Sequence, residues 1–598
     1  MLFLIRNHNA ALLAVDAAGE ICQGPAELSA DSGHWESVYL YRHPDSPELG
    51  FLIAASGRAI TLAGRPAPRR FRPVWLCATA RDDRVAFRDP VSGRMFSCGP
   101  AGGAVETRAE WILGWEEFEL LPAEPTEPIL RATTELCRDI VTARRFTDVG
   151  VTLLTDASRP CPEDVLEALL LVLDDRRAED LCRALLRLVP QQGAGWPSRL
   201  TREPWFAEAC RTLMHRQAPP RRVDETYDFL GAGLDLTSFS QTSPGHRFLR
   251  HARRLAKPTR ELALLATARD EGIYILEWIA HHRVLGVEHV FLYTNNNTDG
   301  SDALLAALDA AGIITWFDNT PGPDAGPLNM QRKAYAHALS VMPQILDFEW
   351  TLVLDLDEYV VPAPMWQNDL RPILRAQGAA NADSIAFPWQ IFFPGQQLTW
   401  RDDLIGLRYT RSGGNPLVKS AFRTNRFAFA DAHHPHEYRD EIRRWVTADG
   451  VVQGDERAVM KTTTHNGVVC HYAIRSLEEF VWKYARGEND GSGVLTEKVF
   501  RFNTPDVVTN FLSFHEENSG NDDHRYAAIA PGVRREIDSL LALPGIRAAR
   551  EHVVACYKAQ IGPLVSGSTA SVNAHPQLSD EHKERWAALV ERWAAQQG

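Results

Sequence analysis

The sequence lacks the cysteine patterns of proteins that are stabilised by disulfide bonds or by zinc ions. Its cysteines are nine in number and contain no Cys-x-x-Cys pair; they lie at positions 22, 77, 98, 137, 161, 182, 210, 470 and 556. An odd, scattered set gives neither a zinc-ribbon spacing nor a disulfide framework. We therefore expect free thiols in a reducing compartment and a cytoplasmic protein.

Long apolar runs and an excess of basic charge are also missing. The longest apolar runs, such as 168–173, fall well short of the roughly 20 residues that a membrane span needs. Residues 1–8 are too short and too poor in basic residues for a signal peptide. With 64 basic against 77 acidic residues, the net charge of −13 argues against a general nucleic-acid binder. We expect no transmembrane segment and no nucleic-acid partner.

What the chain does contain is an ordinary globular composition spread over several domains. It has 598 residues, of which 45% are hydrophobic and 24% charged. Changes in residue pattern along the chain predict a multidomain protein with five parts. These are an all-β domain (1–122), a helical connecting domain (123–215), a linker (216–259), an α/β domain (260–515) and a helical C-terminal region (516–598).

The all-β part carries a degenerate repeat of about 40 residues. Each unit has two apolar strands around a Gly turn, at Gly19, Gly57 and Gly93, followed by a strand rich in aromatics. Three such units resemble a β-trefoil of the fascin-like kind. The resemblance implies a glycan-binding module, and a packing or assembly domain is an equal alternative.

The segments predicted to be helical contain no motif that indicates a catalytic or ligand-binding site. In the C-terminal region, a Ser/Thr/Gly/Pro-rich stretch at 563–577 is expected to separate two helices. The last helix aligns an apolar stripe at 3–4 spacing, formed by Trp586, Leu589, Val590 and Trp593. This stripe either packs on the body of the protein or makes a protein or peripheral membrane contact.

Residues 260–515 alternate between strand and helix patterns. Apolar strands are predicted at 261–267, 290–294 and 313–317, and helices at 274–285 and 303–310. This order predicts a parallel sheet, in which ligands bind beyond the carboxyl ends of the strands. Arg269-Asp-Glu271, the loop 295–299 and Asp355-Leu-Asp357 follow strands in this way.

The apolar run 350–354 ends in the acidic pair Asp355 and Asp357. On a strand, an i, i+2 spacing places both carboxylates on one face. Such a pair can bind one Mg²⁺ or Mn²⁺ that is shared with substrate phosphates. A strand end that carries two solvated acids is the alternative.

Several motifs in the same order resemble the family 2-like and family 92-like glycosyltransferases of the GT-A (Rossmann-like) fold. They are Arg269-Asp-Glu271, Glu277-Trp278, 281–286, 293–299, Gln331 and 355–359. The resemblance implies that Asp355 and Asp357 bind the metal beside a nucleotide-sugar diphosphate. It places Arg269, Glu271 and Asp299 in the nucleoside pocket, with Gln331 and Asp355 also on the donor side. Capping of the following helix is the alternative for Asp299.

Histidines gather downstream, in the stretch Asp431-Ala-His-His-Pro-His-Glu437. Histidines at this density bind metal or move protons, although no zinc spacing is matched. The resemblance puts this stretch and Lys419 on the acceptor side. We expect His434 or Glu437 to take the proton of the acceptor hydroxyl, with Asp431 the other carboxylate candidate.

A last motif joins His471 and Tyr472 to the capping-box pair Ser476 and Glu479. By the resemblance, His471 completes the metal site; a core histidine is the alternative. Tyr472 and Lys483 are candidate acceptor or phosphate contacts, and for Lys483 the alternative is a solvated helix face.

Together these observations predict a Mn²⁺- or Mg²⁺-dependent glycosyltransferase that moves a sugar from a nucleotide-sugar donor to a glycan acceptor in polysaccharide or glycoconjugate synthesis. Inverting stereochemistry is implied by the resemblance. The alternatives are a glycan-binding or scaffolding protein with a degenerate transferase domain, and a nucleotidyltransferase. The latter is disfavoured because no Gly-rich phosphate loop follows the first strand.

Overall fold

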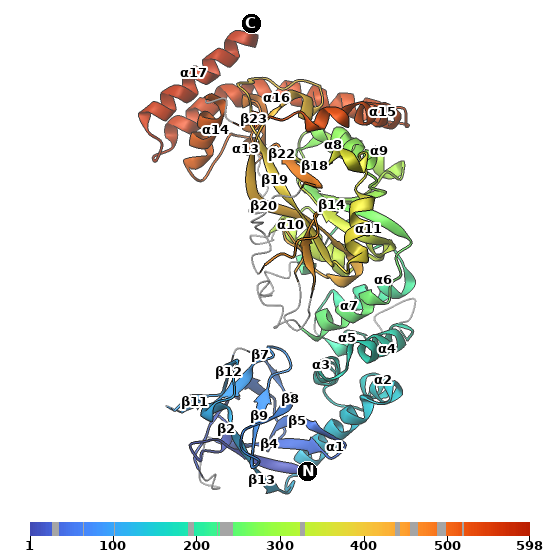
Figure 1. Ribbon diagram of the computed structural model, residues 1–598, viewed down its shortest axis with the longest axis vertical. Coiled ribbons are helices and arrows are strands. Elements are labelled where there is room, and N and C mark those ends of the chain that lie inside the picture. Colours follow the sequence, from blue (N-terminus) through green and yellow to red (C-terminus); the bar gives the residue numbers. More distant parts are fainter. Residues whose placement is uncertain are drawn as a thin grey trace. The chain divides into compact units, whose positions relative to one another are not determined.

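The computed structural model describes residues 1–26, 35–63, 65–100, 102–188, 197–201, 203–223, 225–227, 243–322, 329–436, 443–454, 465–486, 498–516 and 520–597. The chain divides into two compact units, each described here by itself (Figure 1). Unit 1 contains the described residues of 1–217 and 243–255. Unit 2 contains those of 218–227, 256–436 and 443–597.

Unit 1 begins with a closed β-barrel. Its strands pair antiparallel around a ring and return to the first: β1 (Leu2–Arg6), β4 (Glu36–His43), β5 (Ser46–Ala54), β8 (Phe71–Ala78), β9 (Arg84–Arg88) and β13 (Phe118–Ala123). Alternate side chains point inward, so Ile5, Leu40, Leu52, Phe87 and Phe118 are fully buried. Closure leaves these strands without open edges.

The predicted repeat units contain barrel strands together with strands of the hairpins that lie between them. Three antiparallel pairs stand beside the barrel: β2 (Leu13–Val15) with β3 (Ile21–Gln23), β6 (Ile60–Leu62) with β7 (Arg65–Arg69), and β10 (Met95–Ser97) with β12 (Glu106–Ala109). A short strand, β11 (Gly103–Ala104), pairs with β3. Gly19, Gly57 and Gly93 adopt φ of +88°, +66° and +68°, the left-handed region in which glycine is favoured. The glycine spacing thus identified real turns.

The rest of unit 1 is helical, as predicted for 123–215. Its helices are α1 (Pro128–Ala143), α2 (Thr147–Thr155), α3 (Pro162–Val172), α4 (Asp175–Leu186), α5 (Pro197–Leu200), α6 (Phe206–His215) and α7 (Pro244–Arg254). Helix α7 corrects the linker prediction for 216–259. Ser243 caps it by accepting a hydrogen bond from His246 N, and Phe248 is buried against Phe206, with ring centroids 5.3 Å apart. The Gly, Ser and Thr residues that precede this helix in the sequence are the reason that the pattern predicts a linker over the whole stretch.

Unit 2 is built on a large mixed sheet in the strand order β16-β15-β14-β17-β20-β19-β22-β18. The first four strands are parallel: β16 (Ile314–Asp318), β15 (His289–Thr294), β14 (Arg260–Ala268) and β17 (Phe348–Val353). Helices α8 (Gly272–Val284) and α9 (Ser301–Ala310) connect the first three strands. The predicted β-α-β-α-β order and parallel pairing are confirmed.

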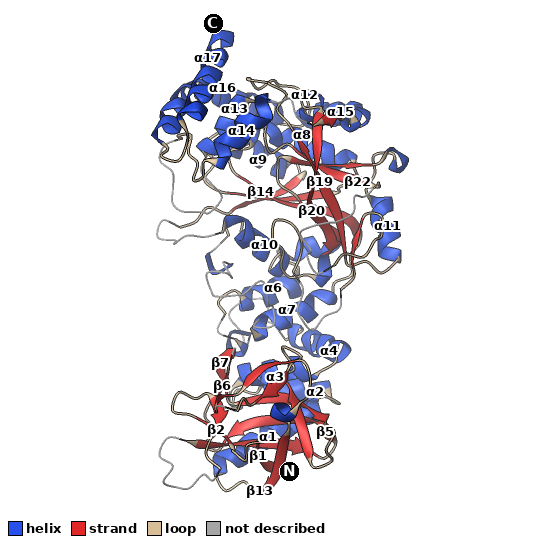
Figure 2. Ribbon diagram, turned by 60° about the vertical axis from the view of Figure 1, so that its left-hand side comes forward, coloured by secondary structure: helices blue, strands red, loops and turns tan. Residues whose placement is uncertain are grey.

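The other half of the sheet is mixed. Strand β20 (Arg411–Arg423) pairs antiparallel with β17 and with β19 (Ser384–Phe392), while β22 (Gly467–His471) pairs parallel with β19 and antiparallel with β18 (Glu358–Pro362). Short strands β21 (Trp445–Thr447), which pairs parallel with β19, and β23 (Asn521–Asp522) complete it. The remaining helices are α10 (Met330–Ser340), α11 (Arg371–Ala379), α12 (Ile405–Arg408), α13 (Leu477–Ala485), α14 (Asp506–Glu516), α15 (Ala530–Leu541), α16 (Ile546–Ala574) and α17 (Asp580–Gln597). Figure 2 shows helices gathered beside the sheet, where α15 packs on α8 and α16 on α9.

One expectation for the C-terminal helices is corrected, and one of the alternatives for the last helix is confirmed. Helix α16 continues through Pro563 to Ala574, because Leu564, Val565 and Val572 remain buried along one face, so the break before α17 covers 575–579 and not the predicted 563–577. The stripe on α17 is covered within unit 2. Trp586 Nε1 donates to Ser568 Oγ at 3.0 Å, and Trp593 Nε1 donates to Glu478 Oε1 at 2.8 Å. The stripe is therefore not open to a membrane or a partner protein.

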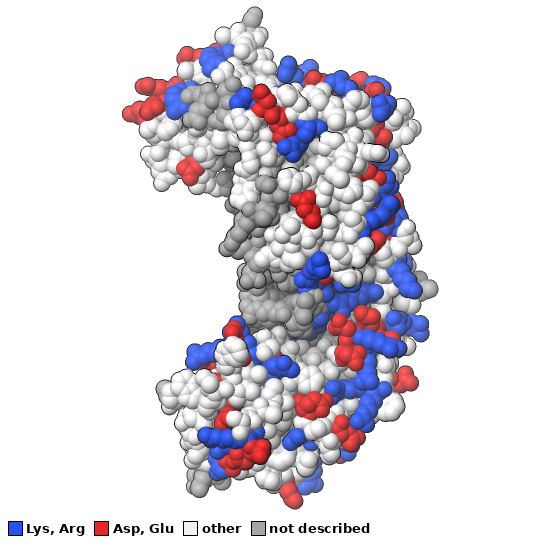
Figure 3. Space-filling model, in the orientation of Figure 1, with Lys and Arg blue, Asp and Glu red and all other residues white. Residues whose placement is uncertain are grey.

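None of the helices in the described part of the chain combines the length and apolarity that a membrane crossing requires. On the face of the described residues drawn in Figure 3, basic and acidic side chains are interspersed on each unit.

One buried acid makes the stability of unit 2 depend on pH. Glu277 on α8 accepts hydrogen bonds at Oε1 from Ile405 N at 2.8 Å and from Tyr526 Oη at 2.9 Å. Burial raises the pKa of Glu277 from 4.5 to about 7. Between these values the folded protein holds a proton that the unfolded chain has released, so Glu277 lowers stability as pH rises through this window.

Glu277→Gln keeps both hydrogen bonds at Oε1 and removes the ionisation. We expect this variant to match the wild type near pH 4 and to exceed it near pH 8 by about 1–3 kcal/mol. Calorimetric unfolding at the two pH values measures the difference. An equal effect at both pH values would contradict the assignment.

Candidate functional site

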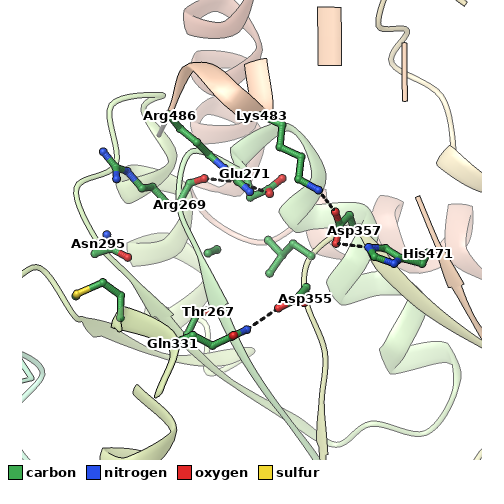
Figure 4. Close-up of a pocket in the computed structure, with 13 residues that line it drawn as sticks. Thr267, Arg269, Glu271, Asn295, Gln331, Asp355, Asp357, His471, Lys483 and Arg486 are labelled. Atoms are coloured by element: carbon green, nitrogen blue, oxygen red, sulfur yellow. Dashed lines mark hydrogen bonds and ion pairs between the residues drawn. The ribbon is translucent and has the colours of Figure 1, made fainter. Parts of the chain in front are cut away.

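A polar cavity of about 220 Å³ lies at the carboxyl ends of the parallel strands (Figure 4). It is lined by Thr267, Ala268, Arg269, Glu271, Asn295, Met330, Gln331, Asp355, Leu356, Asp357, His471, Lys483 and Arg486. In Figure 4, Asp357, His471 and Lys483 gather on one side of the cavity and Arg269 and Asn295 on the other. The strand-end position predicted for a ligand site is therefore where this cavity is found.

The acidic pair lies in a turn, which corrects the prediction of a strand. Strand β17 ends at Val353 and β18 begins at Glu358, so Asp355 and Asp357 belong to the connection. Trp278 on α8 fixes this connection: its Nε1 donates to Asp355 O at 3.1 Å and to Glu358 O at 2.9 Å. Outside a strand the two carboxylates need not share a face, and each contacts different partners.

Asp355 is held by one side chain of the cavity and one of the core. Its Oδ1 accepts from Gln331 Nε2 at 2.8 Å, and its Oδ2 accepts from Lys419 Nζ at 2.7 Å. Lys419 is fully buried and also contacts Glu358 Oε2 at 3.0 Å. Glu358 Oε2 accepts in turn from Asp355 N at 2.9 Å. Lys419 thus lies behind the acid rather than in the cavity, and orients Asp355.

Asp357 is surrounded by cationic and imidazole groups. Its Oδ2 lies 2.7 Å from Lys483 Nζ and 4.0 Å from Arg475 Nη2, and its Oδ1 lies 3.6 Å from His471 Nε2. Burial alone would raise the pKa of Asp357, but Lys483, His471 and Arg475 together hold it well below its usual value. Asp357 is therefore an anion throughout the physiological range.

A second ion pair lines the cavity. Arg486 at the end of α13 pairs with Glu271, the residue that precedes α8, and its Nη1 donates to Arg269 O at 2.7 Å. Burial opposes the charge of Arg486, yet the adjacent Glu271 raises its pKa above the ordinary value. Burial lowers the pKa of Arg269, and its buried Nε has no hydrogen-bond partner in the described part of the chain. Arg269 thus adds a cationic side chain to the lining of the cavity.

Like Lys419, the predicted site residues Asp299 and Tyr472 lie outside the lining of the cavity. Asp299 does not line the cavity: its Oδ2 accepts from Gly272 N at 2.7 Å, and its Oδ1 accepts from Ser301 N at 3.0 Å and from Ser301 Oγ. It therefore ties together the first turns of α8 and α9, in line with the capping alternative. Tyr472 is fully buried among aromatic rings, including Phe392 at 4.7 Å, and does not line the cavity either.

The candidates for the proton acceptor are also outside the cavity lining. His434 lies with Asp431 and His436 in a separate cluster. Glu437 lies outside the described residues.

Sequence reasoning left two contributors unassigned, Glu358 and Arg475. Both are nearly fully buried next to the acidic turn. The signal that could have identified Glu358 is an acid immediately after the pair and at the start of the apolar strand 359–361, since a charge in such a position requires a buried partner.

The donor groups suit a hard divalent cation, although they do not form a closed ligand set. Among the described residues, the one group of three or more potential ligands within 4.8 Å of one another is Asp431, His434 and His436, not the cavity set. Mg²⁺ and Mn²⁺ sites commonly use one or two carboxylates and take the other ligands from water and substrate phosphates. Asp355 and Asp357 are the two carboxylates of the acidic turn that line the cavity, and His471 Nε2 lies 3.6 Å from Asp357 Oδ1.

Comparison with known proteins agrees with the position of this cavity. Residues 269–507 match the family model described as Glycosyltransferase family 92. A protein of Oryza sativa subsp. japonica, named a glycosyltransferase family 92 protein, is 28% identical over 126 residues, 21% of this chain and 20% of its own length. One of Ricinus communis with the same family name is 27% identical over 99 residues, 17% of each chain. The matches thus span about a fifth of the length of these relatives.

The matched segment contains most of the cavity lining, from Arg269 to Arg486. The similarity to glycosyltransferase family 92 therefore supports a glycosyltransferase, with the cavity inside the related segment.

Proposed function

We propose that this chain transfers a sugar from a nucleotide-sugar donor to a glycan acceptor, as an enzyme of polysaccharide or glycoconjugate synthesis. The observation that carries the proposal is the acidic turn Asp355–Asp357 facing Lys483, Arg486 and Arg269 in a strand-end cavity. This combination matches the charge of a donor diphosphate. The family match covers the same segment.

The diphosphate would lie between the acidic turn and the cationic side chains. A Mn²⁺ or Mg²⁺ ion at Asp355 and Asp357, with His471 as a further ligand, would neutralise the charge that develops on the leaving group. The side chain of Lys483 is 24% exposed, and its Nζ lies 2.7 Å from Asp357 Oδ2. Because its stem is flexible, its ammonium group can turn from Asp357 to a phosphate oxygen once a cation shares the carboxylate.

The nucleoside would occupy the opposite side of the cavity. Arg269, Glu271 and Asn295 present hydrogen-bonding groups there, and Gln331 borders the acidic turn. Glu271 is already oriented by Arg486, so its carboxylate is positioned to accept from ribose hydroxyls. The pairing also places a fixed positive charge beside the diphosphate.

The architecture supports two finer expectations. Four parallel strands followed by antiparallel β20 and β19 suit a GT-A fold, for which the resemblance implies inverting transfer. In unit 1, a six-stranded ring with three hairpins suits a β-trefoil, which in this role would bind glycan. Analysis of the anomeric configuration of the product tests the stereochemistry.

Calorimetry with UDP and GDP tests the donor site. We expect one of the two nucleotides to bind in the presence of Mn²⁺ or Mg²⁺ and to bind much more weakly with chelator. Lys483→Ala should weaken this binding by roughly 10-fold, through the loss of one charge-assisted contact. Lys558→Ala, on an exposed face of α16, is the matched control. Binding of neither nucleotide with either ion would contradict the proposal.

A further inference from the structure

Asp431, His434 and His436 form a compact cluster apart from the proposed donor site. Asp431 Oδ2 lies 3.0 Å from His436 Nε2, and Asp431 Oδ1 lies 3.7 Å from His434 Nδ1. One ligand atom from each of the three residues lies within 4.8 Å of the other two. Ligands of a tetrahedral ion at bond lengths of about 2.0–2.1 Å lie roughly 3.4 Å apart, so only small adjustments separate this cluster from a coordination site.

The backbone prearranges the carboxylate. Asp431 Oδ1 accepts hydrogen bonds from His433 N at 2.7 Å and His434 N at 2.9 Å, which directs Oδ2 toward His436. The turn itself is closed by Asp431 N donating to His434 O at 3.0 Å. Such hydrogen bonds to a ligating carboxylate are the outer contacts that orient metal ligands.

Aromatic packing orients the imidazoles. The His434 ring packs edge-on to Trp445 with centroids 5.5 Å apart, and the His436 ring lies 5.6 Å from Phe429. The three side chains nevertheless remain 16–17% exposed. An ion can therefore reach ligands whose orientation is already constrained.

We propose that Asp431, His434 and His436 bind one Zn²⁺ ion. Two imidazoles and one carboxylate are a ligand set that zinc accepts, and three protein ligands leave a fourth position for water or another oxygen. On binding, bonds from the ion to Asp431 Oδ2 and His436 Nε2 would replace the hydrogen bond between these two atoms, and the ring proton of a neutral His436 would move from Nε2 to Nδ1 by exchange with solvent.

This site would stabilise the wall of the proposed donor site. His433, inside the same turn, packs on Trp389 with ring centroids 5.3 Å apart, and Trp389 packs on His471 at 4.3 Å. His433 Nδ1 also contacts Val418 O at 3.0 Å, next to Lys419. A zinc ion that fixes the turn would thereby restrict the position of Trp389 and, through it, His471.

Isothermal titration of the chelator-stripped full chain with ZnCl₂ tests the proposal, with Co²⁺ absorption as a probe of geometry. We expect about one tight equivalent in the wild type. His434→Ala and His436→Ala should each weaken zinc binding by at least on the order of 100-fold, since even groups that only orient ligands are worth about 10–100-fold. His433→Ala, which removes a neighbouring imidazole outside the cluster, should keep the tight site.

Two further variants separate this site from the donor site and from misfolding. Asp357→Asn should keep the tight zinc equivalent and lose only a weaker binding step at the acidic turn, so the inference stands or fails independently of the proposed function. Asp431→Asn keeps the backbone hydrogen bonds to Oδ1 and should still lose affinity, with circular dichroism like that of the wild type. No tight zinc in the wild type, or equal binding in the His434 and His436 variants, would overturn the inference.

Discussion

Replacing Asp357 by Asn should lower kcat/KM for sugar transfer by on the order of 10²–10³-fold. The carboxylate is an anion held by Lys483 and Arg475 beside His471, and it is one of the two acids available to a cation. The amide keeps the shape but removes the charge, so the cation loses an anionic ligand and Lys483 its ion-pair partner. Initial rates at saturating Mn²⁺ measure the change.

Asp522→Asn provides the matched control, because its side chain is 73% exposed and pairs only with Arg411 among the described contacts. This variant should retain the wild-type rate. Thermal unfolding of both variants shows whether a lost rate reflects the site or the fold. A folded Asp357→Asn protein with an unchanged rate would show that the acidic turn does not bind the metal.

Lys419→Met should destabilise unit 2 by about 3–5 kcal/mol, because it leaves the buried carboxylate of Glu358 and the partly buried carboxylate of Asp355 without the cation that they share. Lys419 is 0% exposed and lies 2.7 Å from Asp355 and 3.0 Å from Glu358. Burial opposes its charge, yet the two acids raise its pKa above the ordinary value. Calorimetric unfolding should show the loss as a lower transition temperature.

The same variant should be less affected in acid. Burial raises the pKa of Glu358 to about 7 even with Lys419 present. Protonation of Glu358 below that pH removes one of the two uncompensated charges, so the deficit should shrink from pH 8 to pH 5. Adding Glu358→Gln to Lys419→Met should recover part of the stability. Lys483→Met, on a side chain that is 24% exposed, should cost far less; equal losses at Lys419 and Lys483 would contradict the buried role.

Much of the sheet of unit 2 follows from local pattern. Apolar strands separated by amphipathic or apolar helices predict parallel pairing, and the positions of Arg269, Glu271 and Asp355 after such strands predict one shared edge. The structure places all three in one cavity. The alternation of strand and helix patterns is enough for this prediction, because the β-α-β connection determines both how the strands pair and at which edge of the sheet a ligand binds.

Other positions depend on partners far away in the chain. Asp355 and Asp357 leave the strand because β18 turns away to pair with β22, more than 100 residues later. Lys419 reaches Asp355 from the antiparallel strand β20, and Trp593 reaches Glu478 across 115 residues. No local spacing encodes such contacts, so the buried role of Lys419 could not be predicted, and the stripe on α17 alone could not decide between packing on the body and contact with a partner.

Helix ends show the same limit at short range. The sequence leaves Asp299 equally suited to a ribose and to a helix cap. The structure brings Gly272 N within 2.7 Å of it, which uses the carboxylate for capping. The same type of side chain serves both purposes, and only the position of α8 decides between them.

The most direct test of the central claim is a panel of nucleotide sugars incubated with the full chain and Mn²⁺, with release of the nucleoside diphosphate as the readout. The proposed function predicts hydrolysis or transfer of at least one donor, loss of that activity with chelator, and its loss in Asp357→Asn. No release from any donor, or the same release from the wild type and Asp357→Asn, would contradict it.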